Sequence, residues 1–425
     1  MKIPELLLPA GSLDKLKTAY AFGADAVYCG VPRYSLRARE NEFKLEQLKE
    51  GVEIARSLGK KIYFTVNSIP RNSKLGSYPK FLNEMADMKP DAFIMADPGL
   101  IFLTREAHPE IEIHISVQAN TMNYAAVQFW QKLGATRVIL SREVSIREVA
   151  EIKQQVPDME IEVFVHGSIC IAHSGRCFMS NYYKQRDANQ GSCNNACRDS
   201  HRIFVTNPRQ NDELMELTES EEGTFLMNSK DLRAIEYLDE IIRAGVDSIK
   251  VEGRTKGEYY VAMVSRAYRQ ALDDFQQNKP FDPRLLDELD KVASRKYFSG
   301  FLTRGMEERV PEEELNFQNI EEGTSRTQTQ KNLGKIESYT PDSGMIHFEI
   351  KNKIKKGDII EVFQPGIFES KKWTVTTLVH KNKEKDVLSG GLGMVSVDVP
   401  FPVAVGSFLS VISLEEVHSE EYSTV

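Results

Sequence analysis

The sequence has 425 residues, of which 41% are apolar and 27% are charged, and its formal net charge is −8. This balance is typical of a globular protein, and the length exceeds what one hydrophobic core usually organises, so we expect a large domain and a smaller one. No stretch approaches the roughly 18 consecutive apolar residues of a membrane-spanning helix, and the first residues lack a secretory signal, so we expect a cytoplasmic protein without membrane contact. Because the chain is acidic, any binding of nucleic acid would depend on a local basic surface.

Short apolar runs recur along the first 251 residues and alternate with amphipathic segments. Eight of these runs are predicted as strands: 5–9, 26–30, 61–66, 91–95, 113–117, 137–140, 161–165 and 247–251. The segments between them include predicted helices at 13–22, 45–58, 124–133 and 231–244, and glycines such as Gly59, Gly134 and Gly245 end most of them. Eight strand–helix units predict a parallel (β/α)8 barrel of the TIM type. An open doubly wound sheet is the alternative.

The pattern changes after residue 280. We expect residues 1–280 to form the barrel domain, 281–333 to form an acidic connecting region, and 334–415 to form a small all-β barrel. The last prediction rests on short β-rich runs at 335–337, 344–349, 358–363, 373–379 and 394–397. Residues 331–386 hold eleven lysines against eight acidic residues, a balance that fits a solvated face or an RNA-binding surface.

Four of the five cysteines lie close together, at Cys170, Cys177, Cys193 and Cys197. Four soft thiolates in two pairs predict a site for zinc or for an iron–sulfur cluster. The first pair is wider than the short cysteine pairs of structural zinc sites, which favours the cluster. Three alternatives stay open: buried thiols, disulfides in an oxidising compartment, and a nucleophilic Cys170 assisted by His166 or His173.

The same residues carry a resemblance to a known family. The run from Glu162 to Ser180, EVFVHGSICIAHSGRCFMS, resembles the signature of the collagenase-like peptidases, family U32 among peptidases of unknown type. The matching positions are His166, Gly167, Ser168, Cys170, Gly175, Cys177 and Ser180. The resemblance covers nearly the whole chain, and it is strongest to members involved in making 5-hydroxyuridine in tRNA. It implies a 4Fe-4S cluster on the four cysteines, tRNA as a partner and prephenate as a co-substrate.

In a β/α barrel, residues that follow the strands meet at one mouth, where ligands bind. We expect substrate-binding side chains there from Asn67, Asp97, Gln118, Asn120 and Arg142. An insert at 167–227, after the seventh strand, would bring the cysteines to the same mouth, and its acidic second half is predicted as a solvated face or a hairpin.

The catalytic candidates are His166, Lys250, Glu252 and Arg254. Along a strand, the last three would lie on one side. An internal ion pair would account for two of the charges, and the planar fork of arginine suits an anionic ligand. The family resemblance supports a functional role for this Lys-x-Glu-Gly-Arg run. His166 is either a partner of the metal site or a core histidine.

A loop with Arg33, Tyr34, Arg37 and Arg39 follows the second strand, where it would form either a phosphate and base contact or plain surface. The sequence contains no zincin helix, nucleophile elbow, phosphate-binding loop or dinucleotide fingerprint. We therefore expect a tRNA-modifying protein that forms 5-hydroxyuridine, as the family resemblance implies. A collagenase-like peptidase and a non-catalytic RNA-binding or scaffold protein are the alternatives, and the oligomeric state stays open.

Overall fold

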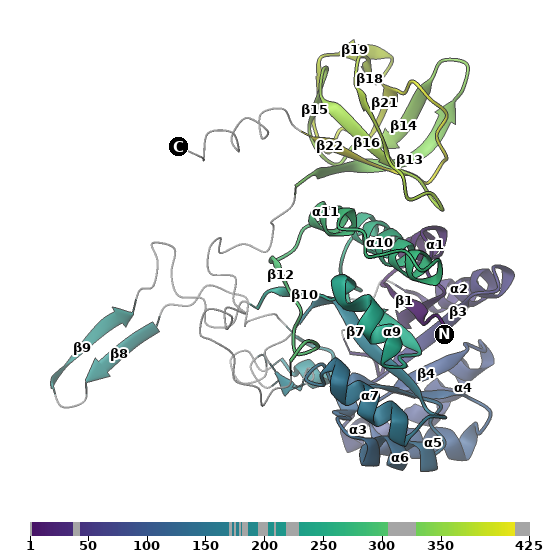
Figure 1. Ribbon diagram of the computed structural model, residues 1–425, viewed down its shortest axis with the longest axis vertical. Helices are drawn as coiled ribbons and strands as arrows, with labels where there is room; N and C mark the ends of the chain where they lie inside the picture. Colours follow the sequence, from purple (N-terminus) through teal and green to yellow (C-terminus); the bar gives the residue numbers. More distant parts are fainter. Residues whose placement is uncertain are drawn as a thin grey trace. The chain divides into compact units, whose positions relative to one another are not determined.

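The computed structural model describes residues 2–36, 43–169, 172–173, 176–177, 180, 186–193, 203–207, 210–217, 229–304 and 329–412, with backbone alone for 203–217 (Figure 1). The chain divides into two compact units. The first comprises residues 1–16, 25–255 and 294–326, and the second comprises 17–24, 256–293 and 327–425.

The first unit is built on a closed barrel of eight parallel strands. These are β1 (Glu5–Ala10), β2 (Ala26–Gly30), β3 (Lys61–Val66), β4 (Ala92–Met95), β5 (Ile113–Ile115), β6 (Arg137–Ile139), β7 (Glu160–Ser168) and β11 (Ser248–Val251). Each strand pairs with the next, and β11 pairs with both β7 and β1, which closes the ring. The predicted parallel barrel is therefore confirmed, and the open sheet is excluded.

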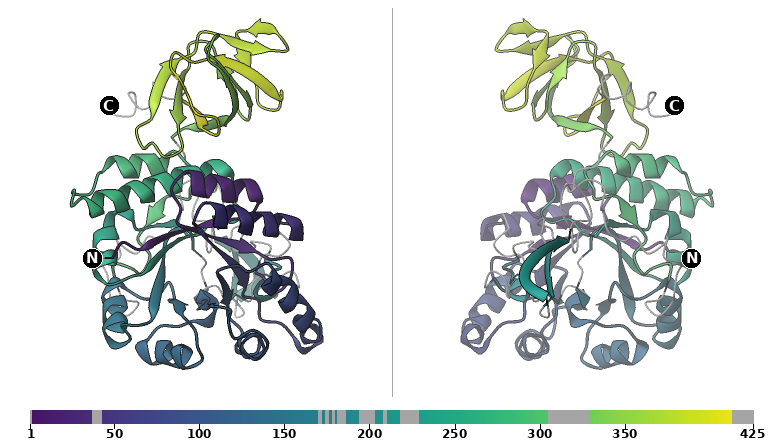
Figure 2. Two further views of the ribbon diagram at one scale, coloured as in Figure 1. Left: turned by 90° about the vertical axis from the view of Figure 1, so that its right-hand side faces the viewer. Right: turned by 90° about the vertical axis from the view of Figure 1, so that its left-hand side faces the viewer.

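Helices cover the outside of these strands (Figure 2). They are α2 (Leu45–Ser57), α3 (Asn72–Leu75), α4 (Tyr78–Asp87), α5 (Pro98–Ala107), α6 (Tyr124–Lys132), α7 (Ile146–Gln155) and α9 (Leu238–Arg243), while α1 (Leu13–Ala21) is divided between the two units. Side-chain oxygens of Asp97, Asn123 and Ser145 accept the first free N–H groups of α5, α6 and α7. Beyond α2 and α6 the backbone turns left-handed at Gly59 and Gly134, as the sequence predicts.

Strand β7 is longer than the other barrel strands, and further chain pairs with its end. β10 (Asp231–Arg233) runs antiparallel to β7, and β12 (Tyr297–Phe298) runs parallel to β10. The predicted helix at 231–244 is therefore wrong in its first half. Asp231 is buried in an ion pair with Arg295, and η6 (Ile235–Tyr237) precedes the helix proper. These contacts favour a short strand over the amphipathic pattern.

Within the insert, β8 (Ile203–Asn207) and β9 (Gln210–Leu217) form an antiparallel hairpin. The hairpin prediction for the acidic second half of the insert is thus confirmed. Nearer to β7, the short helix η4 (Ala188–Gln190) is capped by the carboxylate of Asp187.

The second unit combines an antiparallel sheet with α10 (Glu258–Gln276) and α11 (Arg284–Asp290). The sheet order is β17 (Lys371–Thr374), β16 (Ile359–Phe363), β22 (Phe408–Ile412), β13 (Lys331–Thr340), β14 (Met345–Glu349), β21 (Met394–Asp398), β18 (Leu378–His380) and β19 (Lys383–Lys385). A separate pair is formed by β15 (Ile354–Lys355) and β20 (Val387–Leu388). The sheet is a half-barrel around a core that includes Leu333, Phe348 and Leu409, so the all-β prediction is confirmed.

The predicted single strand at 373–379 is interrupted. β17 ends at Thr374 and β18 begins at Leu378. Between them, the backbone N–H groups of Thr376 and Thr377 donate to the Asp398 carboxylate at 3.1 and 2.7 Å. A carboxylate that satisfies two neighbouring N–H groups fixes a turn, which the β-branched composition of this run does not indicate.

Candidate functional site

The carboxyl ends of the barrel strands lead into polar segments that form the mouth of the barrel. Arg254, in the segment after β11, reaches across the mouth to the loop after β2. Its Nη1 donates to Ser35 Oγ and to Thr65 Oγ1, both at 3.1 Å, and its Nη2 donates to the Leu36 carbonyl at 2.6 Å. The Leu36 N–H in turn donates to Asn67 Oδ1 at 3.0 Å. Arg254 and Asn67 therefore hold this loop in place.

The same loop contains Tyr34, which is buried. Its hydroxyl lies 2.6 Å from the Lys74 carbonyl and 2.7 Å from Ser77 Oγ. A buried ring of this kind is not available to stack a base, so that part of the loop prediction is wrong. Arg37 and Arg39 lie outside the described residues.

The Lys-x-Glu-Gly-Arg run does not continue as a strand. β11 ends at Val251, with an irregular register after Lys250, and Gly253 has a φ of 150°. The three charged side chains are therefore not carried on one side of a strand, contrary to the alternation expected from the sequence.

Lys250 points into the barrel, where it donates to Glu162 Oε1 at 2.7 Å. Glu162 also accepts from Arg137 at 3.1 Å, and Arg137 reaches Glu5 at 2.6 Å. Burial opposes ionisation of Glu162, but Lys250 and Arg137 outweigh it and hold the pKa of this carboxyl below its usual value. The internal ion pair expected for Lys250 exists, and its partner is Glu162 rather than Glu252.

His166 and Glu252 lie where β7 and β11 end. The Glu252 N–H donates to the His166 carbonyl at 2.8 Å. The His166 ring is buried and packs 5.3 Å from the ring of Tyr297. A Cβ at Gly167 would lie 2.5 Å from the Glu252 carbonyl oxygen, and the φ of Gly167 is 107°. The glycine of the His-Gly-Ser signature is therefore required by the close approach of these two strand ends.

The segment after β5 contributes Gln118 and Asn120. Gln118 belongs to the 3-10 helix η2 (Val117–Ala119), and Asn120 ends that helix in a left-handed conformation. Gln118 Oε1 and Asn120 Oδ1 are buried oxygens for which no hydrogen-bond donor lies within reach in the structure described. Asp97, in contrast, caps α5 through the Leu100 N–H at 2.9 Å. Of the expected substrate-binding residues in this part of the mouth, Gln118 and Asn120 each have a side-chain oxygen that can still accept a hydrogen bond.

Arg142 stands beside the start of the insert. Its Nη1 donates to the Ser168 carbonyl at 2.7 Å, and its guanidinium lies 4.1 Å from the centre of the Phe164 ring. Cation–π contact and one hydrogen bond orient the planar group while the side chain stays partly exposed.

Parts of the insert return to this mouth. Asn120 Nδ2 lies 2.7 Å from His173 Nδ1 and 3.0 Å from the His173 carbonyl. Arg176 Nε donates to the Gln118 carbonyl at 2.8 Å. Asn189 Nδ2 donates to the Cys177 carbonyl at 3.1 Å. The insert thus meets the turn after β5 at two points.

Two of the four expected metal ligands are described. Cys177 and Cys193 are of intermediate exposure, and Ser180 Oγ lies 3.6 Å from Cys193 Sγ. Cys170 and Cys197 lie outside the described residues. Among the residues that are described, no group of three His, Cys, Asp or Glu side chains is arranged to hold a metal ion. Cys29 is fully buried in the barrel, as expected for core packing.

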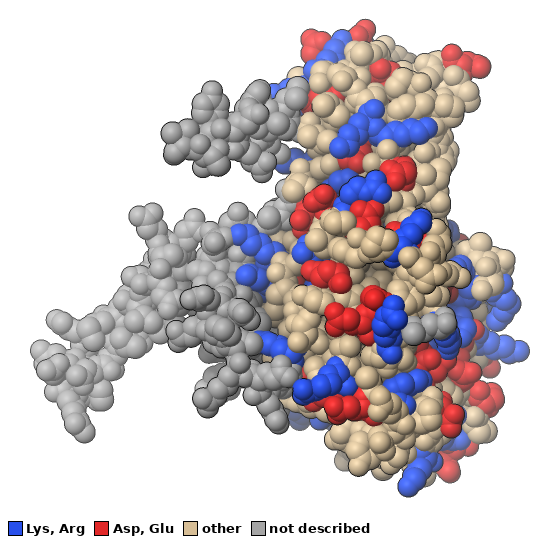
Figure 3. All heavy atoms as spheres, viewed as in Figure 1, with Lys and Arg blue, Asp and Glu red and all other residues tan. Residues whose placement is uncertain are grey.

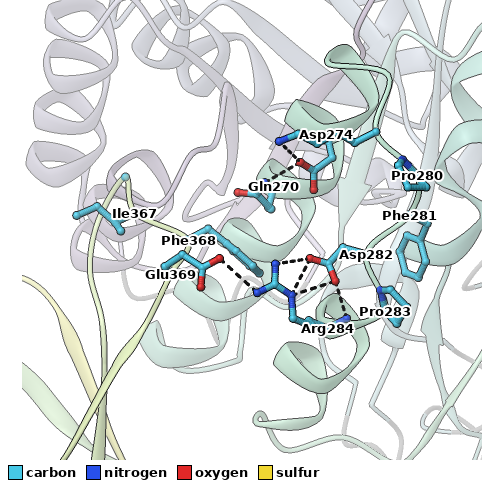
Figure 4. Close-up of a pocket in the computed structure, with 12 residues that line it drawn as sticks. Gln270, Asp274, Pro280, Phe281, Asp282, Pro283, Arg284, Ile367, Phe368 and Glu369 are labelled. Atoms are coloured by element: carbon cyan, nitrogen blue, oxygen red, sulfur yellow. Dashed lines mark hydrogen bonds and ion pairs between the residues drawn. The ribbon is translucent and has the colours of Figure 1, made fainter.

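The second unit contains a separate pocket of about 720 Å³ between the end of α10, α11 and the loop after β16 (Figure 4). Arg284 pairs with Asp282 and Glu369, and Asp274 accepts from Gln270 and Lys279. Each of these charged side chains thus has a partner of opposite charge in the pocket lining.

The surface gives a mixed picture of charge. On the face shown in Figure 3, basic and acidic side chains are interspersed over the described part of the chain. No helix in that described part is long and apolar enough to cross a bilayer.

Sequence reasoning missed several residues that shape the mouth and the barrel interior. Ser35, Thr65 and Arg176 anchor loops, while Glu5, Arg137 and Glu162 form the buried ion network. The signal for the network was present, since each of its members is a charged residue at the start of, or within, a mostly apolar strand. Such a residue needs a partner of opposite charge inside the barrel.

Fold and mouth together define a β/α-barrel protein whose seventh strand leads into a cysteine-bearing insert. The chain belongs to peptidase family U32, which matches residues 11–312, and the U32 C-terminal domain matches residues 328–409.

Three relatives illustrate the range of the family. The chain is 44% identical to tRNA hydroxylation protein P of Haemophilus influenzae over 438 residues, which covers 93% of each chain. It is 44% identical to tRNA hydroxylation protein P of Escherichia coli over 399 residues, covering 85% of this chain and 86% of the relative. It is also 29% identical to a protein named Collagenase from Porphyromonas gingivalis, covering 85% of this chain and 86% of the relative.

Proposed function

We propose that this protein takes part in tRNA hydroxylation, as the enzyme or an enzyme component that forms 5-hydroxyuridine. The observation that carries this proposal is the 44% identity to a relative named tRNA hydroxylation protein P over 93% of both chains. The similarity spans the barrel, the insert and the second unit alike, so the parts needed for the activity have counterparts here.

The mouth offers chemistry that suits a uracil base. Uracil carries one imide N–H donor between two carbonyl acceptors, and proteins read such edges on bases that have left the helix stack. Gln118 Oε1 is a buried acceptor with no donor among the described residues, and a buried acceptor in that state gains from a ligand N–H. Arg142 would provide donors to a carbonyl or carboxylate oxygen, because only its Nη1 is engaged in the described hydrogen bonds.

The proposed co-substrate is prephenate, which carries two carboxylates. A guanidinium is the side-chain group best shaped to bind a carboxylate, and Arg142 is the arginine of the mouth that supports this proposal. Arg254 is less suited, since three acceptors of the protein already occupy its Nη groups.

We also propose that Cys170, Cys177, Cys193 and Cys197 hold a 4Fe-4S cluster, with zinc as the alternative. The two described thiols fit such a group, because neither is sealed in the core. When bound, the cluster would supply electron transfer. Protein purified without oxygen should contain about four irons per chain and lose its visible absorption in Cys177→Ser, while Cys29→Ser keeps it. A colourless protein with one zinc per chain would establish the alternative.

Deletion of the gene tests the function directly. Nucleosides from total tRNA are digested and quantified by mass spectrometry, in a host without a redundant pathway. Loss of 5-hydroxyuridine on deletion, and its return on complementation, is the expected result. Normal levels in the deletion strain would refute the hydroxylation role.

The similarity to the Porphyromonas gingivalis relative named Collagenase supports peptidase activity as a second candidate. Cys29 is a poor nucleophile for it, because burial raises the pKa of its thiol far above the usual value despite the nearby Arg254. A peptidase would cleave peptides after removal of iron and without RNA. A scaffold protein would show neither cleavage nor dependence on the residues of the mouth.

A further inference from the structure

Asn120 has a backbone conformation that few residues adopt. Its φ and ψ are 54° and 45°, in the left-handed region, and its N–H donates to the Val117 carbonyl at 3.0 Å. Asparagine and glycine tolerate this conformation better than other residues. The turn after β5 thereby directs the amide of Asn120 toward the insert.

The orientation of this amide is fixed by its partner. The His173 carbonyl oxygen, 3.0 Å away, can only accept a hydrogen bond, so the Asn120 nitrogen rather than its oxygen faces His173. The second hydrogen of that nitrogen then meets His173 Nδ1 at 2.7 Å. Nδ1 must accept it, which places the ring proton of His173 on Nε2. One amide nitrogen therefore binds both the backbone and the ring of His173.

A second contact returns from the insert to the same turn. Arg176 Nε donates to the Gln118 carbonyl at 2.8 Å, and the Arg176 N–H donates to the His173 carbonyl at 3.1 Å. His173 and Arg176 are thus joined to each other and to both ends of a three-residue stretch, 118–120. This pairing places Arg176, the residue before Cys177, beside the turn after β5.

We propose that Asn120 is a positioning residue that holds the segment before Cys177 against the barrel mouth. The assignment differs from the substrate contact expected from the sequence. Through His173 and Arg176, Asn120 sets where Cys177 stands relative to Gln118, while Asn189 holds the Cys177 carbonyl from the other side. The absorption and nucleoside measurements below rest on the proposed cluster and function, whereas the hydrogen-exchange comparison does not, since the contact itself is a property of the folded chain.

The test compares Asn120→Gly with Asn123→Gly in the full-length protein purified without oxygen. Glycine keeps the left-handed turn at position 120 and removes both bonds to His173. Asn123 undergoes the same change three residues away, where it caps α6 and makes no described contact with the insert. Hydrogen exchange measured by mass spectrometry should rise about tenfold in peptides covering 172–177 in Asn120→Gly alone. Peptides from β1 to β4 should be unchanged in both.

Two further readings separate positioning from substrate contact. Under a chelator, the visible absorption of Asn120→Gly should decay several-fold faster than that of the wild type or Asn123→Gly. His173→Ala keeps the backbone carbonyl that accepts from Asn120, so its rise in hydrogen exchange should be smaller than that of Asn120→Gly. The double variant Asn120→Gly/His173→Ala should exchange only slightly faster than Asn120→Gly, because both changes remove the same contact.

Unchanged exchange at 172–177 in Asn120→Gly would overturn the proposal, whatever the effect on tRNA. Loss of 5-hydroxyuridine with normal exchange and normal absorption would also overturn it and return Asn120 to the substrate. If the wild type itself had no role in tRNA hydroxylation, the exchange comparison would still decide the positioning role. Should Asn120→Gly fail to fold, His173→Ala tests the same contact from the insert.

Discussion

At the scale of the residue, Glu162 is the most constrained charged group of the barrel. Its side chain is fully buried between Lys250 and Arg137. Replacement by glutamine leaves two buried cations with reduced compensation, and we expect Glu162→Gln to lower the free energy of unfolding by about 3–5 kcal/mol. Urea denaturation measures the change. Glu151→Gln, at an exposed carboxylate on α7, should cost less than about 0.5 kcal/mol. Equal costs in the two variants would contradict the network.

The same network predicts how stability depends on pH. Burial lowers the pKa of His114 below its usual 6.5, and Glu162 has a pKa held below its usual 4.5. In both cases the unfolded chain binds protons at a higher pH than the folded chain does, so stability falls as the pH drops. We expect a decline that begins below about 6.5 and steepens below about 4.5.

Urea midpoints at several pH values measure this decline, and His114→Gln should remove its upper part. A free energy of unfolding that stays constant in the wild type from neutral pH down to below 4.5 would contradict the account.

Arg254 provides a third test at this scale. Lysine keeps the charge but cannot reach Ser35, Thr65 and the Leu36 carbonyl together. We expect Arg254→Lys to lower the free energy of unfolding by about 1–3 kcal/mol. Arg243→Lys, at an exposed ion pair with Asp239, is the matched control and should be close to neutral. If Arg254→Lys lost hydroxylation with full stability, Arg254 would instead belong to the chemistry.

Residue roles were harder to predict than residue positions. The mouth residues Asn67, Gln118, Asn120 and Arg142 follow barrel strands, as their place in the sequence indicates. Their long-range hydrogen-bond partners lie 26 to 58 positions away in the chain, for example Ser168 for Arg142 and Arg176 for Gln118. No local pattern encodes contacts at that range. For this reason the sequence could not separate groups that hold loops from groups that remain available to a ligand.

At the scale of the element, α10 and α11 are joined to the C-terminal sheet by a buried polar network. Lys291 on α11 pairs with Glu361 on β16 at 2.9 Å and with Glu288 on its own helix. Glu361 is almost fully buried, so loss of Lys291 leaves it poorly compensated. We expect Lys291→Met to destabilise the second unit by about 3 kcal/mol or more.

Thermal unfolding followed by tryptophan fluorescence, with Trp130→Phe in every variant so that Trp373 alone emits, reports on this unit, because the Trp373 side chain is buried in its core. Lys279→Met is the matched control, since Lys279 is exposed and bonds only Asp274 among described residues. A shift of equal size in both variants would count against the network.

Elements with strong periodicity were predicted well, and those fixed by long-range contacts were not. All eight barrel strands appear within a few residues of their predicted bounds, because a strand buried on both faces needs a continuous apolar run. The strand β10 was missed because its pairing with β7 and the ion pair of Asp231 with Arg295 override the local helical pattern. The turn at 375–377 depends on Asp398, more than twenty residues later.

At the scale of the whole molecule, the chain comprises a closed barrel, a cysteine-bearing insert and a second unit, and relatives named tRNA hydroxylation protein P match it over most of its length. The barrel supplies a mouth with amide and guanidinium groups, and Asn120 meets the insert there. The family was recognisable from one signature run, whereas the fold is needed to show which charges pair inside the barrel.

The measurement that tests the central claim most directly is the 5-hydroxyuridine content of tRNA in a deletion strain that carries plasmid copies of this chain. We predict that the wild type and Cys29→Ser restore the nucleoside, because Cys29 is a core residue. Cys177→Ser and Cys193→Ser should restore less than about a tenth of it at equal protein levels. Full restoration by both serine variants, or none by the wild type in a strain shown to lack the nucleoside, would contradict the account.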